Sequence, residues 1–292
     1  MCRFALYLGS PITISQLVTE PDHSIVNQSY RSRERVEPLN GDGFGIAWYA
    51  EEHSPEPASF RSISPAWSNL NLRHLARVTS SACILAHVRA ATPGLPVTEL
   101  NCHPFVWQDF AFMHNGELGE FPRYKRQLLS GLSDEAFHMI RGSTDSEHVF
   151  AWFLDRLRDE KAKYSQDSPS RLTLMTRAVM ATIQDIESLR RRADVRSPAS
   201  LNLAVTDGSR AVVTRYHSGG GEGANSLYHA RGSAYECRDG VCRMIAGSDD
   251  ARALLVASEP LSKETEWQAV PTNHLISLEL GQAVQVMPIS LA

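Results

Sequence analysis

The sequence lacks any stretch near the roughly 18 consecutive apolar residues that a membrane-spanning helix needs. Its beginning also lacks a charged segment followed by an apolar one, so we expect no secretory signal. Neither sign of charge dominates, because 29 basic residues meet 33 acidic ones and the net charge is -4 at pH 7. Such a chain has no basic field for nucleic acid or for an anionic membrane, and we expect neither as a partner.

Cysteine is scarce, and its number is odd. Disulfide frameworks use even sets of cysteine in an oxidising compartment, so we expect reduced thiols and a cytoplasmic location. The last two cysteines predict a hairpin with two free thiols, because zinc ligands at recognisable spacing are absent. We therefore expect no metal. The cysteines are Cys2, Cys83, Cys102, Cys237 and Cys242.

Short apolar runs of strand length lie toward both ends of the sequence, with two long stretches of helical spacing between them. The helical stretches cover residues 145–161 and 172–189, and Ser143 or Thr144 is placed to cap the first. This order is not the alternation of a doubly wound sheet, so we expect an α+β fold with mostly antiparallel sheets covered by helices. No break in composition forces a boundary, and we expect one domain over residues 2–292. The predicted strands are residues 4–8, 44–50, 83–90, 110–114, 201–205, 211–216, 254–257, 275–280 and 283–287, with surface loops at 51–57 and 218–225.

Cys2 is the residue best suited to nucleophilic chemistry. A small residue in second position lets an aminopeptidase remove Met1, which leaves Cys2 with a free α-amine at the start of a strand. An α-amine has a pKa of about 8, against about 8.5 for a thiol, so it can serve as the adjacent base. One residue then supplies nucleophile and base, as in the N-terminal threonine arrangement. An accidental cysteine in second position is the alternative, so the prediction depends on other residues.

Three further positions suit substrate binding, and each has a structural alternative. Arg89 ends a predicted strand, where it suits either bidentate capture of a carboxylate or a surface salt bridge. Asn115 and Gly116 end another strand, where they form a plain hairpin turn or offer an amide and an N–H to an oxyanion. Asp145 begins a helix, where it complements the helix dipole or binds an ammonium group.

Motifs along most of the chain resemble those of the class II glutamine amidotransferases. That resemblance implies an N-terminal-nucleophile hydrolase with a four-layer αββα sandwich. The chain most resembles the short stand-alone members, such as the γ-glutamyl hydrolase of ergothioneine biosynthesis and the amidotransferase-like subunit of the fungal glutathione-degradation complex. The motifs that carry the resemblance are residues 1–4 (MCRF), 23–29 (HSIVNQS), 40–45 (NGDGFG), 87–92 (HVRAAT), 101–105 (NCHPF), 114–116 (HNG), 143–147 (STDSE), 257–261 (ASEPL) and 267–271 (WQAVP).

The resemblance implies an amidohydrolase with a covalent intermediate. Cys2 matches the family's nucleophile, and Asn115 with Gly116 matches its oxyanion hole. The thiol is then expected to attack the γ-carbonyl of glutamine or of a γ-glutamyl compound. Water hydrolyses the resulting γ-glutamyl thioester to glutamate. The mechanism implied by the resemblance needs no organic cofactor.

The resemblance also implies a small-molecule substrate with a γ-glutamyl head. Arg89 and Thr92 match the residues that hold its α-carboxylate, and Asp145 matches the residue that binds its α-amino group. Pro93 stands where many synthase-linked members have histidine, which favours a γ-glutamyl compound over free glutamine. The leaving amine is not encoded in a recognisable way.

Three rival interpretations stay open. An N-terminal-nucleophile hydrolase of another acyl group would need neither Arg89 nor Asp145. A second thiol site would combine Cys102 with His103 or His87, although neighbours along a strand point to opposite faces. The rival outside the enzymes is a non-catalytic or partner-dependent γ-glutamyl-binding subunit of a larger complex. The chain has no room for a synthase domain, so ammonia channelling would require a partner subunit, and a homo-oligomer is equally open.

Overall fold

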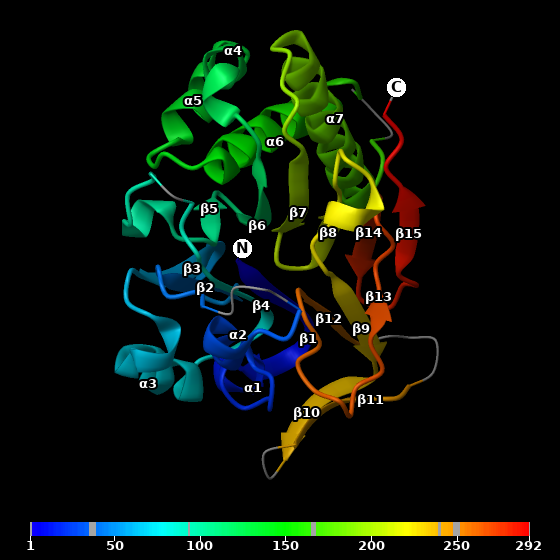
Figure 1. The fold of residues 1–292 in the computed structure, drawn as a ribbon. Coiled ribbons are helices and arrows are strands. Elements are labelled where there is room, and N and C mark those ends of the chain that lie inside the picture. The colour runs from blue at the N-terminus through cyan, green and yellow to red at the C-terminus, as the bar shows by residue number, and fades with distance from the viewer. Residues whose placement is uncertain are drawn as a thin grey trace.

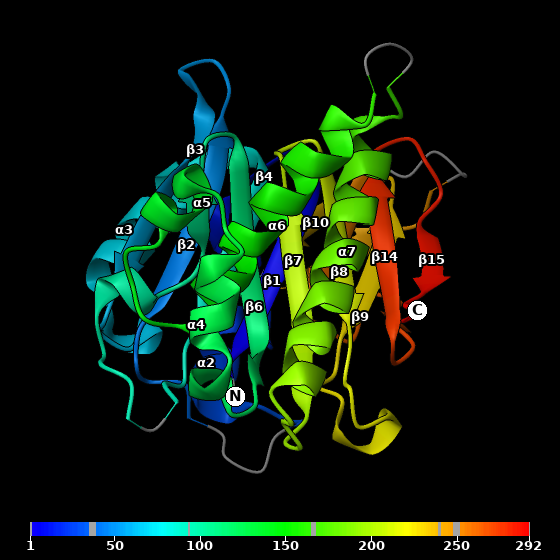
Figure 2. The same ribbon diagram turned by 90° about the horizontal axis from the view of Figure 1, so that it is seen from above.

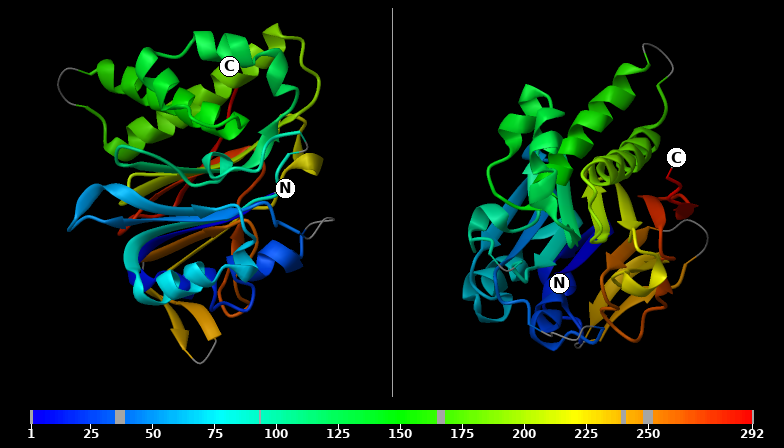
Figure 3. Two further views of the ribbon diagram at one scale, coloured as in Figure 1. Left: turned by 90° about the vertical axis from the view of Figure 1, so that its left-hand side faces the viewer. Right: turned by 45° about the horizontal axis from the view of Figure 1, so that its top comes forward.

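Two antiparallel sheets lie face to face, and helices cover the outer face of each (Figure 1). The computed structural model describes residues 2–34, 39–92, 94–164, 168–238, 241–247 and 252–291. Viewed along the sheets, the layers follow one another as helices, sheet, sheet and helices (Figure 3). The αββα sandwich and the antiparallel sheets that we expected are therefore confirmed. Within the described ranges, no helix has the length and apolar character needed to cross a bilayer.

The first sheet contains the beginning of the chain in its centre. Its order is β13-β9-β12-β1-β4-β2-β3, so the first strand pairs with one strand from the N-terminal half and one from near the C-terminus. Its strands are β1 (Arg3–Thr13), β2 (Phe44–Ala50), β3 (Ser54–Ser62), β4 (Ser80–Val88), β9 (Tyr228–Gly232), β12 (Ala253–Ala257) and β13 (Gln268–Ala269).

The second sheet has the order β15-β14-β8-β7-β6-β5. Its β6 and β7 lie at the centre, above the first sheet, and the view from above shows α6 and α7 lying across them (Figure 2). Its strands are β5 (Phe105–Trp107), β6 (Phe110–Leu118), β7 (Ala199–Thr206), β8 (Arg210–Arg215), β14 (His274–Glu279) and β15 (Gln285–Pro288).

The outer layers divide the helices between the two sheets. The short N-terminal helices pack on the first sheet, and the long central ones pack on the second. The α-helices are α1 (Ile14–Val18), α2 (Ile25–Arg31), α3 (Leu70–Val78), α4 (Lys125–Ser130), α5 (Asp134–Met139), α6 (Asp145–Ala162) and α7 (Arg171–Arg192). The 3-10 turns are η1 (Ala66–Ser68), η2 (Glu99–Asn101), η3 (Phe121–Arg123) and η4 (Gly221–Gly223).

Alternation along β1 explains why both faces of this strand are buried. Phe4, Leu6 and Leu8 point into the core between the two sheets, while Ala5 and Tyr7 pack under the helices. Successive strand residues face opposite sides, and each buried large apolar side chain contributes about 1.5–3 kcal/mol. The apolar run therefore fixes β1 in the middle of the sandwich and sets the direction in which its first residues emerge.

The expected elements are largely confirmed, with two corrections. Both long helices and the nine predicted strands exist, with boundaries shifted by a few residues. The predicted turn at Asn115-Gly116 is wrong, because β6 continues to Leu118 and pairs these residues with β7. The predicted loop at 51–57 is wrong in its second half, because β3 begins at Ser54. In both places pairing with a neighbouring strand overrides the local turn preference.

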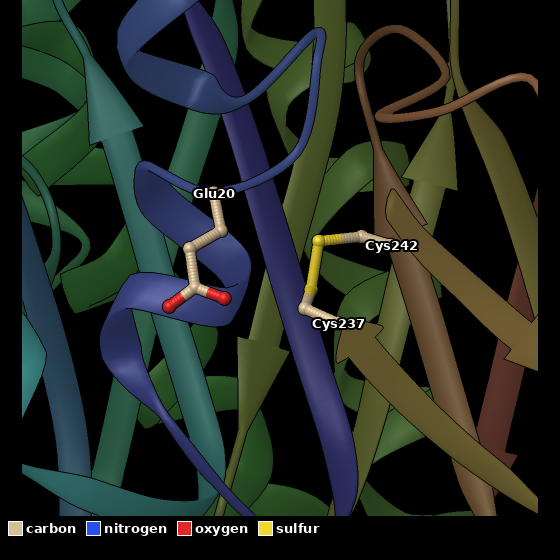
Figure 4. Close-up of side chains that lie close together, drawn as sticks. All are labelled: Glu20, Cys237 and Cys242. Carbon is tan, nitrogen blue, oxygen red and sulfur yellow. A yellow bond between two sulfur atoms is a disulfide. The ribbon is translucent and has the colours of Figure 1, made fainter. Parts of the chain in front are cut away.

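The expected hairpin near the C-terminus exists as β10 (Ala234–Arg238) and β11 (Val241–Ile245). Cys237 and Cys242 face each other across it and form a disulfide, so the prediction of two free thiols is wrong. The pair lies beside Glu20, just beyond α1 (Figure 4). Direct cross-strand positions bring the two sulfur atoms within bonding reach, which the sequence spacing alone does not establish.

Candidate active site

Cys2 lies immediately before β1, at the rim between the two sheets. The strand register pairs Arg3 with Val88, so Cys2 lies opposite the residue that follows β4, and its thiol donates to the carbonyl oxygen of Ala90 at 3.6 Å. The left view of Figure 3 shows the N-terminus at one edge of the sandwich, between the two sheet layers. The side chain is only partly buried, so the thiol is placed where a small molecule could reach it.

Arg89 and Thr92 follow β4 on the same rim. Arg89 is 3% exposed, and its backbone N–H donates to the carbonyl of Gly43 at 2.8 Å. Its guanidinium lies 3.4 Å from the carbonyl of Asp42, whose carboxylate accepts from the N–H of Ala91. This network holds the chain beyond β4 against the loop before β2. Thr92 is exposed at the end of that chain.

Asn115 is completely buried near the end of β6, opposite Asn202 of β7. Neither polar atom of its side chain has a hydrogen-bond partner among the described residues. A buried amide without partners is costly, and it leaves hydrogen-bonding groups available to a bound ligand. Gly116 follows it, and a Cβ there would lie 1.9 Å from the carbonyl oxygen of Ser200, so only glycine lets β6 and β7 approach this closely.

Two buried histidines connect this part of β6 to its surroundings. His87 of β4 lies with Nε2 3.2 Å from the carbonyl oxygen of His114, so Nε2–H must donate across the sheets. Burial lowers the pKa of His87 to about 3, and burial also lowers the pKa of His114. His114 donates from Nε2 to the Ser200 carbonyl at 2.9 Å, and its Nδ1 forms a hydrogen bond with the Ser146 hydroxyl at 2.8 Å. The residue before Asn115 is therefore fixed to β4, β7 and α6.

Asp145 is the first residue of α6, and the Thr144 hydroxyl caps that helix, as the sequence predicted. One carboxylate oxygen accepts from the N–H of Leu118 at 2.7 Å, and the other accepts from the N–H of Ser146 at 2.8 Å. The fold thus places Cys2 and Arg89 together on one sheet, with Asn115 and Asp145 on the facing sheet and its helix.

Cys102 is poorly suited to act as the nucleophile. It is fully buried, and its sulfur contacts the carbonyl oxygens of Thr98 and Ser62 at 3.5 and 3.7 Å. Burial raises the pKa of its thiol to about 11, although Arg89 opposes the rise. A thiol with so high a pKa supplies little thiolate near neutral pH. His103 packs its ring on His87 at 4.3 Å, which is a packing role.

Comparison with known proteins decides the family. A family model described as glutamine amidotransferases class-II matches residues 16–191, which is more than half of the chain. The chain belongs to the class II glutamine amidotransferases. This amidotransferase is 42% identical over 305 aligned residues to a Saccharomyces cerevisiae protein named "Probable glutamine amidotransferase DUG3", and the match covers 99% of this chain and 84% of the yeast protein.

A second relative and a solved structure agree with this assignment. The γ-glutamyl-hercynylcysteine sulfoxide hydrolase of Mycobacterium tuberculosis is 26% identical over 279 residues, covering 95% of this amidotransferase and 93% of the relative. The solved structure of a glutamine aminotransferase class-II domain protein from Silicibacter pomeroyi superimposes with a TM-score of 0.66 at 26% identity. That match covers 99% of this chain and all of the other.

Two expectations fall on residues outside those that the structure describes, namely the removal of Met1 and the effect of Pro93. Both stay predictions.

Sequence reasoning gave no role to Arg3, His23 or Glu259, which prove to be buried polar residues behind Cys2. The available signal was one ionisable residue inside each of three short motifs. Their role becomes visible only when the fold brings these distant segments together.

Proposed function

We propose that this amidotransferase hydrolyses the γ-amide bond of a γ-glutamyl compound through a γ-glutamyl thioester on Cys2. The observation that carries the proposal is the buried, unpartnered amide of Asn115 on the sheet that faces the Cys2 rim. A buried polar group without a protein partner is available to bind an oxygen that develops charge during reaction.

The reaction begins with proton transfer from the Cys2 thiol to its own α-amine, which becomes free once Met1 has been removed. The thiolate attacks the γ-carbonyl carbon, and the carbonyl electron pair moves to oxygen. The side-chain N–H of Asn115 and the N–H of Gly116 stabilise that oxyanion. The α-ammonium then protonates the departing nitrogen as the C–N bond breaks. Water attacks the thioester and releases glutamate, returning the proton to the thiol.

Substrate selection follows from the two charged residues at the rim. Arg89 and Thr92 hold the α-carboxylate, and Asp145 holds the α-ammonium group of the γ-glutamyl head. Gripping both ends of the head fixes the γ-carbonyl beside the thiol, which converts a bimolecular step into a positioned one. We propose γ-glutamyl amides and peptides as the substrate class, with the group beyond the amide nitrogen still to be identified.

The test compares two thiol variants of the full-length protein. Cys2→Ala should reduce hydrolysis of a γ-glutamyl panel (glutamine, glutathione and larger amides) to background, whereas Cys102→Ala should keep most of it. Intact mass should show the chain without Met1. Full turnover in Cys2→Ala, or a fully active protein that retains Met1, would refute the mechanism.

The same experiment addresses the rival outside the enzymes. Wild-type protein that binds the γ-glutamyl panel by calorimetry but never turns it over would identify a binding subunit.

We further propose that residues 2–292 act as one catalytic domain in the cytoplasm. Fractionation of cells and gel filtration of the purified chain would test its location and whether it works alone or with a partner subunit.

A further inference from the structure

A buried carboxylate behind Cys2 collects hydrogen bonds from three separate segments of the chain. Glu259 follows β12 and is 1% exposed. One oxygen accepts from Arg3 Nε at 2.6 Å and from the Ser32 hydroxyl. The other accepts from His23 Nε2 and from the N–H of Arg33, at 2.7 and 2.8 Å. Both carboxylate oxygens are thus fully satisfied, which fixes the carboxylate plane.

Arg3 connects the Glu259 carboxylate to the backbone of the nucleophile Cys2. Its side chain is almost completely buried, and Nη1 donates to the carbonyl oxygen of Cys2 at 3.0 Å while Nη2 donates to the Ser32 hydroxyl at 3.0 Å. The guanidinium therefore bonds Glu259 and the Cys2 carbonyl at the same time. The carbon of that carbonyl is bonded to the Cα of Cys2, which carries the α-amine directly and the thiol through Cβ.

The residues around this ion pair lock the next part of β1 as well. The N–H of Phe4 donates to the Ser258 hydroxyl at 3.0 Å, and the N–H of Ser258 returns a bond to the Phe4 carbonyl at 2.9 Å. Gln28 donates to the backbone carbonyls of His23 and Glu259. Residues of three sequence motifs, 1–4, 23–29 and 257–261, thus meet around the Glu259 carboxylate.

Charge and burial agree with a permanently ionised Glu259. Burial raises its pKa, but the hydrogen bonds from His23, Ser32 and Arg33 together with the Arg3 charge outweigh this and hold the pKa well below its usual range. A buried ion pair is in itself weak evidence for added stability. The contact that indicates a role other than stability is the hydrogen bond from the Arg3 guanidinium to the carbonyl of Cys2.

We propose that Glu259 is a positioning residue for the nucleophile, acting through Arg3 to fix the orientation of Cys2. The proposal rests on the proposed function, in which the Cys2 thiol and α-amine must both face the γ-carbonyl. Loss of the carboxylate charge frees the Arg3 guanidinium to turn, and the Cys2 carbonyl loses its fixed donor. Misplacing a reacting group by about 1 Å costs roughly 100-fold in rate.

The first experiment compares Glu259→Gln with a matched control, Asp155→Asn. Asp155 is also a buried carboxylate, accepting from the N–H and hydroxyl of Ser133 at 2.7 and 2.6 Å, but it lies in α6 away from Cys2. Glu259→Gln should lower kcat for γ-glutamyl p-nitroanilide by roughly 10–100-fold while KM changes less than about threefold. Asp155→Asn should lower the thermal midpoint and leave kcat of the folded protein near wild type. Glu259→Asp should restore part of the lost kcat.

The second readout needs no turnover and separates this proposal from the proposed function. The rate at which iodoacetamide alkylates Cys2 can be measured by peptide mass spectrometry at a series of pH values. In Glu259→Gln this rate should be lower than in the wild type, and it should depend on pH in a different way. The buried thiols of Cys83 and Cys102 serve as internal references. If Cys2→Ala keeps full turnover, the proposed function fails, but the alkylation profile still tests whether Glu259 orients Cys2.

Arg3→Lys covers the case in which Glu259→Gln does not fold. Lysine keeps the charge, but its single ammonium replaces the fork that now spans Glu259 and the Cys2 carbonyl, so the same fall in kcat is expected. A folded Glu259→Gln or Arg3→Lys protein with wild-type kcat and a wild-type alkylation profile overturns the proposal. The network would then be an ordinary structural ion pair.

Discussion

Replacing Asn115 by alanine should separate catalysis from stability, because its side-chain amide bonds to nothing in the described protein. Removing one oxyanion donor typically costs about 2.7–4 kcal/mol of transition-state stabilisation, which is roughly a 100–1000-fold fall in kcat. KM should change little, since the donor acts on charge that develops only after the thiol attacks.

The stability of Asn115→Ala, in contrast to its kcat, should stay the same or increase. A buried polar group without a partner carries a desolvation cost of about 1–3 kcal/mol, and Asn115→Ala relieves that cost. The small cavity left by the shorter side chain offsets part of the gain. We therefore expect a thermal midpoint within about 2 °C of the wild type, or above it.

Asn202 provides the matched control for stability. It is also fully buried and lies opposite Asn115 in the register of β6 and β7. Its Oδ1 has no partner among the described residues, but its amide nitrogen donates to the carbonyls of Asn225 and Ser226 at 3.2 and 3.1 Å. Asn202→Ala removes those bonds and should cost about 1–3 kcal/mol, or roughly 2–6 °C in thermal midpoint. Kinetics with γ-glutamyl p-nitroanilide and thermal melts measure both quantities. An Asn115→Ala protein that melts several degrees lower and keeps wild-type kcat would refute the reasoning.

Three further outcomes follow from the structure. His87→Gln should reduce the stability that the wild type loses as the pH falls from 6.5 to about 3. In that pH window the unfolded wild type binds a proton at His87 that the folded state does not bind, and above pH 6.5 this contribution is complete. Thermal melts whose midpoint depends on pH as steeply in the variant as in the wild type would contradict this. Arg89→Lys should raise KM for γ-glutamyl substrates roughly 10–100-fold through loss of bidentate binding, and an unchanged KM would remove Arg89 from the carboxylate site. Replacing both Cys237 and Cys242 by serine should lower the free energy of unfolding by about 2 kcal/mol or less, because the loop that the disulfide closes is short. It should leave kcat unchanged, because the disulfide lies beyond the end of β1 opposite to Cys2. A large loss of kcat would link the hairpin to the site.

Local patterns predicted those features that depend on neighbours in the sequence. The apolar alternation of β1 and β2, the helical spacing of α6 and α7 and the cap at Thr144 are all consequences of side-chain periodicity and backbone hydrogen bonding. The motifs were equally local, and they carried the family assignment, because residues that surround a reaction centre keep their spacing along each strand.

Long-range pairing decided what the sequence could not. Asn115 and Gly116 form a strand and not a turn because β7 supplies a partner more than 80 residues away in the chain. Cys237 and Cys242 bond because the hairpin register places them opposite each other.

The sequence by itself determined the nucleophile candidate at Cys2, the order of strands and helices, and the family. Only the tertiary structure decided that Glu259 lies behind Cys2, across 256 residues from Arg3, and that the Asn115 amide is buried without a partner among the described residues. The physical reason is that burial and hydrogen-bond satisfaction are properties of the assembled sandwich. No local pattern states which polar group will lose its water and which distant group will replace it.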